Sequence, residues 1–222
     1  IGPHWDGNQV WFITAGGALF AAWPVVYAVA FSGFYWALLL VLFAMFFRPV
    51  GFEYRSKMTD PRWRGAWDWG LTIGGAVPAL VFGVAFGNLF LGVPFTFDEL
   101  MRSTYTGSFW ALLNPFALCG VVSLLMLAMH GATYLQMRTV GELHLRARKT
   151  AVLLGVVVTV CFAIAGFWVS NIPGYVIQSA GDMAGMMTPL QKVVALKEGG
   201  WLENYGRYPW MISAPILGFV GL

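Results

Sequence analysis

One run of the chain constrains the fold more than any other feature. From Gly7 to Phe47 the sequence carries no charged residue over 41 positions. As a single α-helix this run would be roughly 60 Å long, because a helix rises about 1.5 Å per residue. The hydrocarbon core of a bilayer is only about 30 Å thick, so the run predicts two membrane crossings. We expect the turn between them near Ser32 and Gly33, with Pro24 as a kink or an alternative break.

The rest of the chain is equally apolar. Charged residues make up 10% of the sequence, against about 25% in an ordinary soluble domain. Residues 70–93, 110–135 and 150–172 are each long enough to cross a bilayer once, and a partial apolar run begins at Pro209. The sequence therefore predicts an all-α, polytopic transmembrane helix bundle. We expect one transmembrane domain over residues 1–222, with about five spans and the start of a sixth.

The basic residues are concentrated in two of the loops between these stretches. One loop carries Arg48, Arg55, Lys57, Arg62 and Arg64, and another carries Arg138, Arg146, Arg148 and Lys149. The loop between these two has only Arg102, beside Asp98 and Glu99. By the positive-inside rule the two basic loops face the cytoplasm, which also places Asp6 near the cytoplasmic face. Basic residues spread in this way mark orientation and do not form a nucleic-acid surface.

Asp6 lies at the mouth of the first crossing and fits two interpretations. A carboxylate this close to the low-dielectric membrane core holds a proton more readily than one in water, so it can relay protons. An aspartate ahead of a helix is also a preferred N-cap, where it accepts backbone N–H bonds. The two roles are compatible, and both remain open.

Two further charged residues border the predicted crossings. Arg48 follows two phenylalanines and precedes a proline, so we expect it to end a span. It is either an ordinary arginine that extends its guanidinium to the membrane interface or a functional residue. Asp68 stands between two tryptophans just before the next apolar stretch. It fits either a helix cap or the partner of a nearby arginine.

His130 is the one histidine well inside a predicted crossing, so it is a candidate haem ligand. A haem held by two histidines needs a second histidine at the same depth, and neither His4 nor His144 lies inside a crossing. We therefore expect His130 to be a hydrogen-bonded packing residue.

Two glycine pairs have the spacing of a helix-packing motif. Gly70 and Gly74, and likewise Gly83 and Gly87, put small residues on one face of a helix. They predict packing seams within the bundle and a partner subunit. No phosphate-binding loop, dinucleotide fingerprint, HExxH or CxxC motif occurs in the sequence.

Six segments carry a resemblance to a known family. They are HWDGNQVW (4–11), TAGGALFAAWP (14–24), FRPVGFEYRSK (47–57), VAFGNL (84–89), LLNPF (112–116) and GATYL (131–135). These segments resemble subunit II of cytochrome bd-type ubiquinol oxidases, and the resemblance covers essentially the whole chain. It implies an internal fragment of that subunit, without the first span and the C-terminal part, which would not be active alone.

The resemblance implies one subunit of a respiratory complex of the bacterial inner membrane that oxidises quinol and reduces O2 to water. In that family the haems, b and d in type, belong to subunit I. Subunit II is haem-free, packs against subunit I in the lipid membrane, and contributes to proton supply and haem insertion. No cofactor is expected to bind this chain directly, and a structural quinone in it is left open.

The resemblance also assigns roles to three residues. Asp6 corresponds to an acidic residue at the cytoplasmic entrance of a proton path towards the haems. Arg48 and Asp68 correspond to residues for which we expect a supporting role at the interface with the haem subunit.

Two other functions remain as alternatives. A proton-coupled secondary transporter would use Pro24, Pro78 and Pro115 to break helices around a central site. Such a transporter would have an internal repeat, and the two halves of this chain show no convincing similarity. A purely structural assembly subunit is the third interpretation.

Overall fold

The computed structural model describes the backbone of residues 2–100, 102–179 and 193–221, with side chains for all of these except 2–6, 8, 9 and 115. It forms two compact units, Ile1–Leu127 and Ala128–Leu222. Among the described residues, four helices are long and apolar enough to cross a membrane. The predicted helical membrane bundle is confirmed, whereas the count of five spans and part of a sixth, within one domain, stays a prediction.

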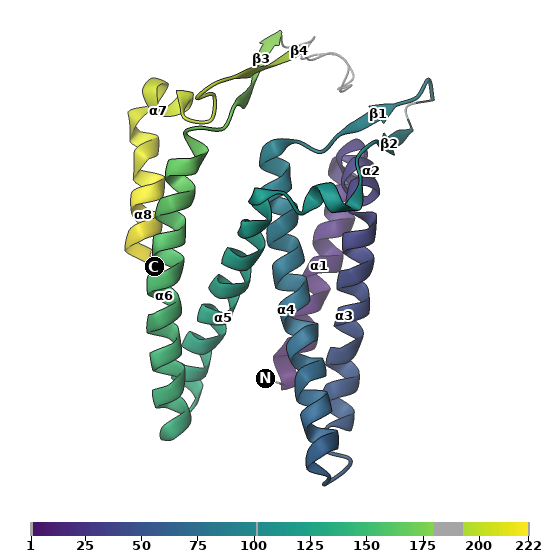
Figure 1. Cartoon of the computed structure of the whole chain (residues 1–222), viewed down its shortest axis with the longest axis vertical. Helices are drawn as coiled ribbons and strands as arrows, with labels where there is room; N and C mark the ends of the chain where they lie inside the picture. The colour runs from purple at the N-terminus through teal and green to yellow at the C-terminus, as the bar shows by residue number, and fades with distance from the viewer. Residues whose placement is uncertain (1, 101, 180–192, 222) are drawn as a thin grey trace. The chain divides into compact units, whose positions relative to one another are not determined.

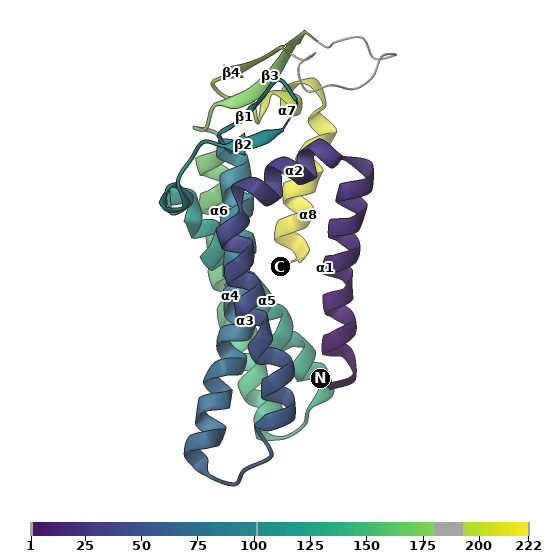
Figure 2. The ribbon, with the colours of Figure 1, turned by 90° about the vertical axis from the view of Figure 1, so that its right-hand side faces the viewer.

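The long uncharged run folds into three helices of the first unit. They are α1 (Gly2–Ala22), α2 (Pro24–Gly33) and α3 (Tyr35–Tyr54). Figure 2 shows α2 lying across the space between the ends of α1 and α3. The run therefore breaks at both expected places, because Pro24 begins α2 and the chain bends again at Phe34. The connection is a ten-residue helix, where we predicted a simple turn.

Helix α4 (Pro61–Leu91) runs beside α3 (Figure 1) and begins well before the predicted apolar stretch. The carboxylate of Asp60 accepts the backbone N–H of Arg62 at 2.9 Å, and Pro61 occupies the first turn. Both features favour a helix start at this place. Asp68 consequently lies inside α4, so of its two interpretations the helix cap is wrong.

The core of the first unit lies between α3, α4 and the segment that follows them. Phe34, Val41, Val81, Val84 and Leu112 are buried together there. After α4 the chain forms a short antiparallel pair, β1 (Phe95–Phe97) and β2 (Ser103–Tyr105).

The third predicted crossing begins later than expected. Two 3-10 turns, η1 (Phe109–Leu112) and η2 (Pro115–Ala117), precede α5 (Leu118–Arg138). Asn114 separates them, and its side-chain oxygen accepts the N–H of Phe116 at 2.8 Å. This local bond competes with a regular helix, so residues 110–117 wind more tightly than an α-helix.

The second unit starts within α5 and continues into α6 (Glu142–Val169). An antiparallel pair, β3 (Gly174–Ser179) and β4 (Val193–Lys197), follows. Then come α7 (Glu203–Arg207), the 3-10 turn η4 (Pro209–Ile212) and α8 (Ser213–Gly221). Helix α8 packs on α6, where the rings of Phe162 and Phe219 meet edge to face at 4.9 Å.

Candidate functional site

Glycines of α4 allow α3 and α4 to pack closely along the seam between them. A Cβ atom on Gly74 would lie 2.9 Å from the carbonyl oxygen of Ala44 and 2.8 Å from Cγ of Arg48. One turn earlier, a Cβ on Gly70 would touch Phe47 at 3.4 Å. The two backbones therefore approach more closely than larger residues would allow, and the predicted packing role of this glycine pair is confirmed.

Arg48 lies within this seam. Its side chain is half-buried, and its aliphatic part occupies the space that the missing side chain of Gly74 leaves. Helix α3 includes Pro49 and continues to Tyr54, so Arg48 does not end the helix, and its expected place at the end of the membrane span stays a prediction. The aliphatic part of Arg48 thus packs against α4, and this contact restricts where its guanidinium can lie.

Asp68 forms an ion pair that links α4 to the end of α3. Its two carboxylate oxygens accept hydrogen bonds from Nε and Nη2 of Arg55, at 2.5 and 3.1 Å. The hydrogen bond to Asp68, together with its charge, raises the pKa of Arg55. A two-pronged hydrogen bond of this kind favours the ionised carboxylate, and the pair links the two helices.

Aromatic rings surround this ion pair. The indole N–H of Trp63 donates to the carbonyl of Tyr54 at 2.9 Å, which is a second link between the two helices. Trp63 also meets Trp67 edge to face, with 5.8 Å between ring centroids. The end of the α3–α4 hairpin is therefore held by one ion pair, one hydrogen bond and ring contacts.

Asp6 belongs to α1, which begins at Gly2. The residue is therefore inside the helix, and its expected N-cap position is not observed. Its side chain lies outside the described part of the structure, so the structure does not place the carboxylate relative to Arg48 or Asp68. Its proton-transfer role stays a prediction.

A buried amide pair, which the sequence analysis did not identify, fixes the start of α5. Asn88 is 5% exposed. Its amide nitrogen donates to the carbonyls of Val84 and Leu112, at 2.9 and 3.0 Å. Its amide oxygen accepts from the Asn114 side chain at 2.7 Å. Both asparagines lie in segments that carry the family resemblance, but nothing in the sequence alone pairs residues 26 positions apart.

The second glycine pair packs beside this amide pair. A Cβ on Gly87 would collide with the carbonyl oxygen of Phe116, and one on Gly83 with that of Cys119. From the other side, a Cβ on Gly120 would lie 2.6 Å from the carbonyl of Leu80. The predicted seam is confirmed, although it faces the start of α5 and not α3.

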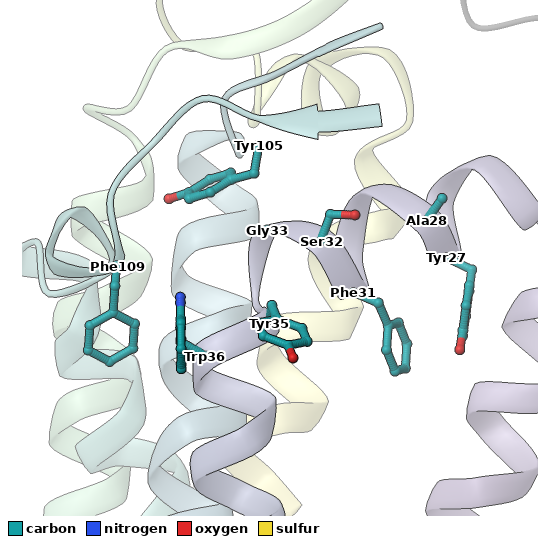
Figure 3. Close-up of a pocket in the computed structure, with 9 residues that line it drawn as sticks. All are labelled: Tyr27, Ala28, Phe31, Ser32, Gly33, Tyr35, Trp36, Tyr105 and Phe109. Atoms are coloured by element: carbon teal, nitrogen blue, oxygen red, sulfur yellow. The ribbon is translucent and has the colours of Figure 1, made fainter. Parts of the chain in front are cut away.

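The first unit also contains an aromatic cavity of about 460 Å³ (Figure 3). It is lined by α2, the start of α3, β2 and η1, through Tyr27, Ala28, Phe31, Ser32, Gly33, Tyr35, Trp36, Tyr105 and Phe109. Figure 3 shows Tyr27 and Phe31 pointing from α2 to the same side, and their rings stack at 4.1 Å. No lining residue is charged, so the cavity is suited to an apolar group.

His130 is exposed on α5 and lines a groove of the second unit. Among the described residues it has no hydrogen-bond partner, so the expectation of a hydrogen-bonded packing residue is not met. His144 is engaged elsewhere, because its Nδ1–H donates to the carbonyl of Gln136 at 2.8 Å. The described side chains contain no cluster of three His, Cys, Asp or Glu that could hold a metal ion.

Comparison with known proteins gives a consistent result. The family model described as cytochrome bd terminal oxidase subunit II matches residues 1–222. The cytochrome bd-I ubiquinol oxidase subunit 2 of Escherichia coli K12 is 61% identical over 222 residues, which cover 99% of this chain and 59% of that protein. The probable cytochrome oxidase subunit 2 of Haemophilus influenzae is 57% identical over 221 residues, covering 99% of this chain and 58% of the relative.

A more distant relative is the cytochrome bd ubiquinol oxidase subunit 2 of Bacillus subtilis. It is 38% identical over 167 residues, which cover 74% of this chain and 48% of the relative. The chain thus spans about three-fifths of the length of the first two relatives.

Proposed function

Because the chain belongs to the cytochrome bd terminal oxidase subunit II family, we propose that it forms part of a quinol-oxidising, oxygen-reducing complex of the bacterial inner membrane. The observation that carries this proposal is the family match over all 222 residues. A relative with 61% identity is itself named as a subunit of a ubiquinol oxidase. At this similarity the two chains share their fold, and the four long apolar helices fit an integral membrane subunit.

The haems of the complex belong, in this proposal, to a partner subunit I. Two haem types, b and d, supply the electron transfer and oxygen reduction there. This subunit then acts on the reaction from outside the haem pocket.

Its contribution is the supply of protons. Each quinol gives up two electrons and two protons, and reduction of O2 to water consumes one proton for every electron. Protons for water formation must therefore reach a site inside the membrane, where bulk water is excluded. Asp6, predicted to lie at the cytoplasmic mouth of the first crossing, would take protons from the cytoplasm and pass them inward.

Arg48 and Asp68 would act through position. Arg48 is packed against Gly74, and Asp68 is paired with Arg55, so both help to fix the α3–α4 hairpin. A rigid hairpin would present a defined surface to subunit I and so support haem insertion. A supporting role of this kind would explain why Arg48 and Asp68 each contact another residue of the same hairpin.

The test is the Asp6→Asn variant of the full-length subunit in the purified complex. Loss of a positioned proton-transfer group lowers a rate by about 100-fold, so quinol-dependent oxygen uptake per haem should fall by this order. Asp98→Asn is the matched control, because Asp98 is an acidic residue of a loop predicted to face the other side. It should leave oxygen uptake unchanged.

The outcomes separate the competing functions. A loss of haem in Asp6→Asn, with normal uptake per remaining haem, would indicate an assembly subunit instead of a proton path. Unchanged uptake and unchanged haem would contradict the proton role. If the wild-type complex shows no quinol-dependent uptake, and the subunit alone transports a solute in proteoliposomes, the transporter alternative is correct.

A further inference from the structure

The hairpin between α5 and α6 carries unbalanced positive charge. Residues 138–149 contain four basic side chains and one acidic side chain, namely Arg138, Arg146, Arg148, Lys149 and Glu142. Glu142 is already paired with Arg146 at 2.5 Å. Arg148 and Lys149 have no acidic partner within the described chain, and Arg138 stacks over the ring of Tyr134 at 5.7 Å. An anion from outside the chain is therefore favoured at this hairpin.

The length of α6 places these charges at a defined depth. The helix has 28 residues and is therefore about 42 Å long. Its uncharged part, residues 150–169, is about 30 Å long, which matches the hydrocarbon core of a bilayer. Residues 142–149 then extend about 12 Å into the layer of lipid headgroups. The unpaired cations are thus at the level of lipid phosphates.

The fold holds the hairpin in one shape. The Nδ1–H of His144 donates to the carbonyl of Gln136, and Ala147 is buried at 6% exposure. Thr139 donates to the carbonyl of Leu135 at 2.6 Å. The basic side chains therefore project from an ordered turn.

An apolar groove of about 700 Å³ begins next to the hairpin. Met129 and Thr133 of α5 line it, together with Val152 and Val156 of α6. The hydroxyls of Thr133 and Thr159 donate to carbonyls of their own helices, and His130 adds one polar side chain to the wall. Gly155 has no side chain and so leaves space in the groove. A Cβ added there would meet Met129 Sδ, at 3.6 Å.

The basic residues of α6 lie close to one end of the groove. Arg148 and Lys149 precede Val152 by four and three residues, which places them one helical turn from the groove on a similar face of α6. Arg138, five residues after Thr133, lies on a different face of α5 and is not part of this alignment. An apolar chain in the groove would therefore end in a headgroup beside these cations.

We propose that the α5–α6 hairpin binds an anionic phospholipid of the cytoplasmic leaflet, with its phosphate at Arg148 and Lys149 and one acyl chain in the groove. The positive-inside rule places the hairpin at that leaflet, whose surface is negative. A zwitterionic lipid would fill the groove but would leave the excess charge of the hairpin unbalanced. This site is independent of the oxidase function, since it depends only on α5 and α6 crossing the bilayer.

The experiment uses the full-length subunit in its native complex after removal of bound lipid. Dioleoylphosphatidylglycerol or dioleoylphosphatidylcholine is titrated in detergent micelles, and bound lipid is counted by native mass spectrometry. Each basic residue contributes about fivefold to binding at an anionic surface, so the R148Q/K149Q variant should bind phosphatidylglycerol about 30-fold more weakly. The matched control is R62Q/R64Q, which removes the same charge from the other basic loop and should retain the wild-type preference.

The proposal is overturned if R148Q/K149Q keeps the wild-type preference for phosphatidylglycerol, or if R62Q/R64Q loses it equally. It is also overturned if inorganic phosphate competes as well as the lipid, because the site would then be a simple anion site. The milder Arg148→Gln variant keeps the test valid if the double variant does not assemble. That variant should weaken phosphatidylglycerol binding about fivefold, and a wild-type affinity would contradict the proposal.

Discussion

At the scale of single residues, the ion pair between Arg55 and Asp68 has a clear structural role. It joins the residue after α3 to the third turn of α4, across a short connection that contains the N-cap Asp60. Both side chains are about half-exposed, at 42% and 53%. Because solvent screens such a pair, we expect its importance to lie in the geometry of the hairpin more than in the overall stability.

We predict that Asp68→Asn lowers the haem content of the purified complex, because Arg55 would lose its charged partner and the hairpin its fixed end. The exchange R55D/D68R should recover most of the haem, since it restores the pair in reverse. Haem per complex is measured from the pyridine haemochrome spectrum. An exchange variant as poor in haem as Asp68→Asn would show that the identity of each residue matters, and not their pairing.

The buried amide pair gives the second residue-scale prediction. Replacing Asn88 by Leu removes the donor to the Leu112 carbonyl. It also removes one acceptor of the Asn114 amide nitrogen, which keeps its bond to the Ala111 carbonyl. Unsatisfied buried groups of this kind cost about 1–3 kcal/mol of unfolding free energy. Chemical denaturation of the full-length subunit measures this loss.

Asn171→Leu is the control for that substitution. Asn171 is exposed, and within the described part of the chain its side-chain amide bonds only to the carbonyl of Phe167, at 3.3 Å. We expect a change within about 0.5 kcal/mol, as for an ordinary surface substitution. Equal losses for the two variants would show that the buried network contributes nothing specific.

These residues also show how far a sequence predicts a site. Arg48 and Asp68 were identifiable because a charge in an apolar chain is conspicuous. The partner of Asp68 was only partly predictable, since several arginines of one loop were within reach. Asn88 was not identified, because a neutral amide gives no such signal and its partner, Asn114, lies in a different element.

At the scale of elements, hydropathy located the helices but not their ends. Helix α4 begins at Pro61 and α6 at Glu142, both within charged sequence. Apolar composition marks the part of a helix that contacts lipid, whereas caps and backbone hydrogen bonds decide where the helix starts. The same reasoning explains α2, because Pro24 can begin a helix as easily as it can break one.

The α3–α4 seam supplies an element-scale prediction with a neighbouring control. Gly74→Ala would place a methyl group against the Ala44 carbonyl and the stem of Arg48. Overpacking of this kind costs about 1–3 kcal/mol. Gly75→Ala meets nothing within 4 Å, and should be neutral or stabilise the helix by up to about 1 kcal/mol.

Thermal unfolding of the purified full-length subunit compares these two variants. A lower midpoint for Gly74→Ala alone is the expected result. If both variants unfold at the wild-type temperature, the seam tolerates a side chain and Arg48 is not fixed by it.

At the scale of the whole molecule, composition was sufficient to predict a helical membrane protein, and matched segments were needed to identify its family. The pattern of apolar residues does not distinguish an oxidase subunit from a transporter, because the helices of both cross the same lipid bilayer. The segments around Asp6, Arg48 and Asn114 carried that information. The proposed proton path could not be traced from the sequence, because the sequence does not show which side chains approach one another in space.

The most direct test of the proposed function is a reduced-minus-oxidised optical spectrum of the full-length subunit, purified alone and then with its presumed haem subunit. Quinol-dependent oxygen uptake is recorded on the same samples. We predict haem bands and oxygen uptake only in the co-purified complex, and neither in the subunit alone. Failure of any haem-bearing partner to co-purify, or a complex with haem but no oxygen uptake, would contradict the assignment to a quinol oxidase.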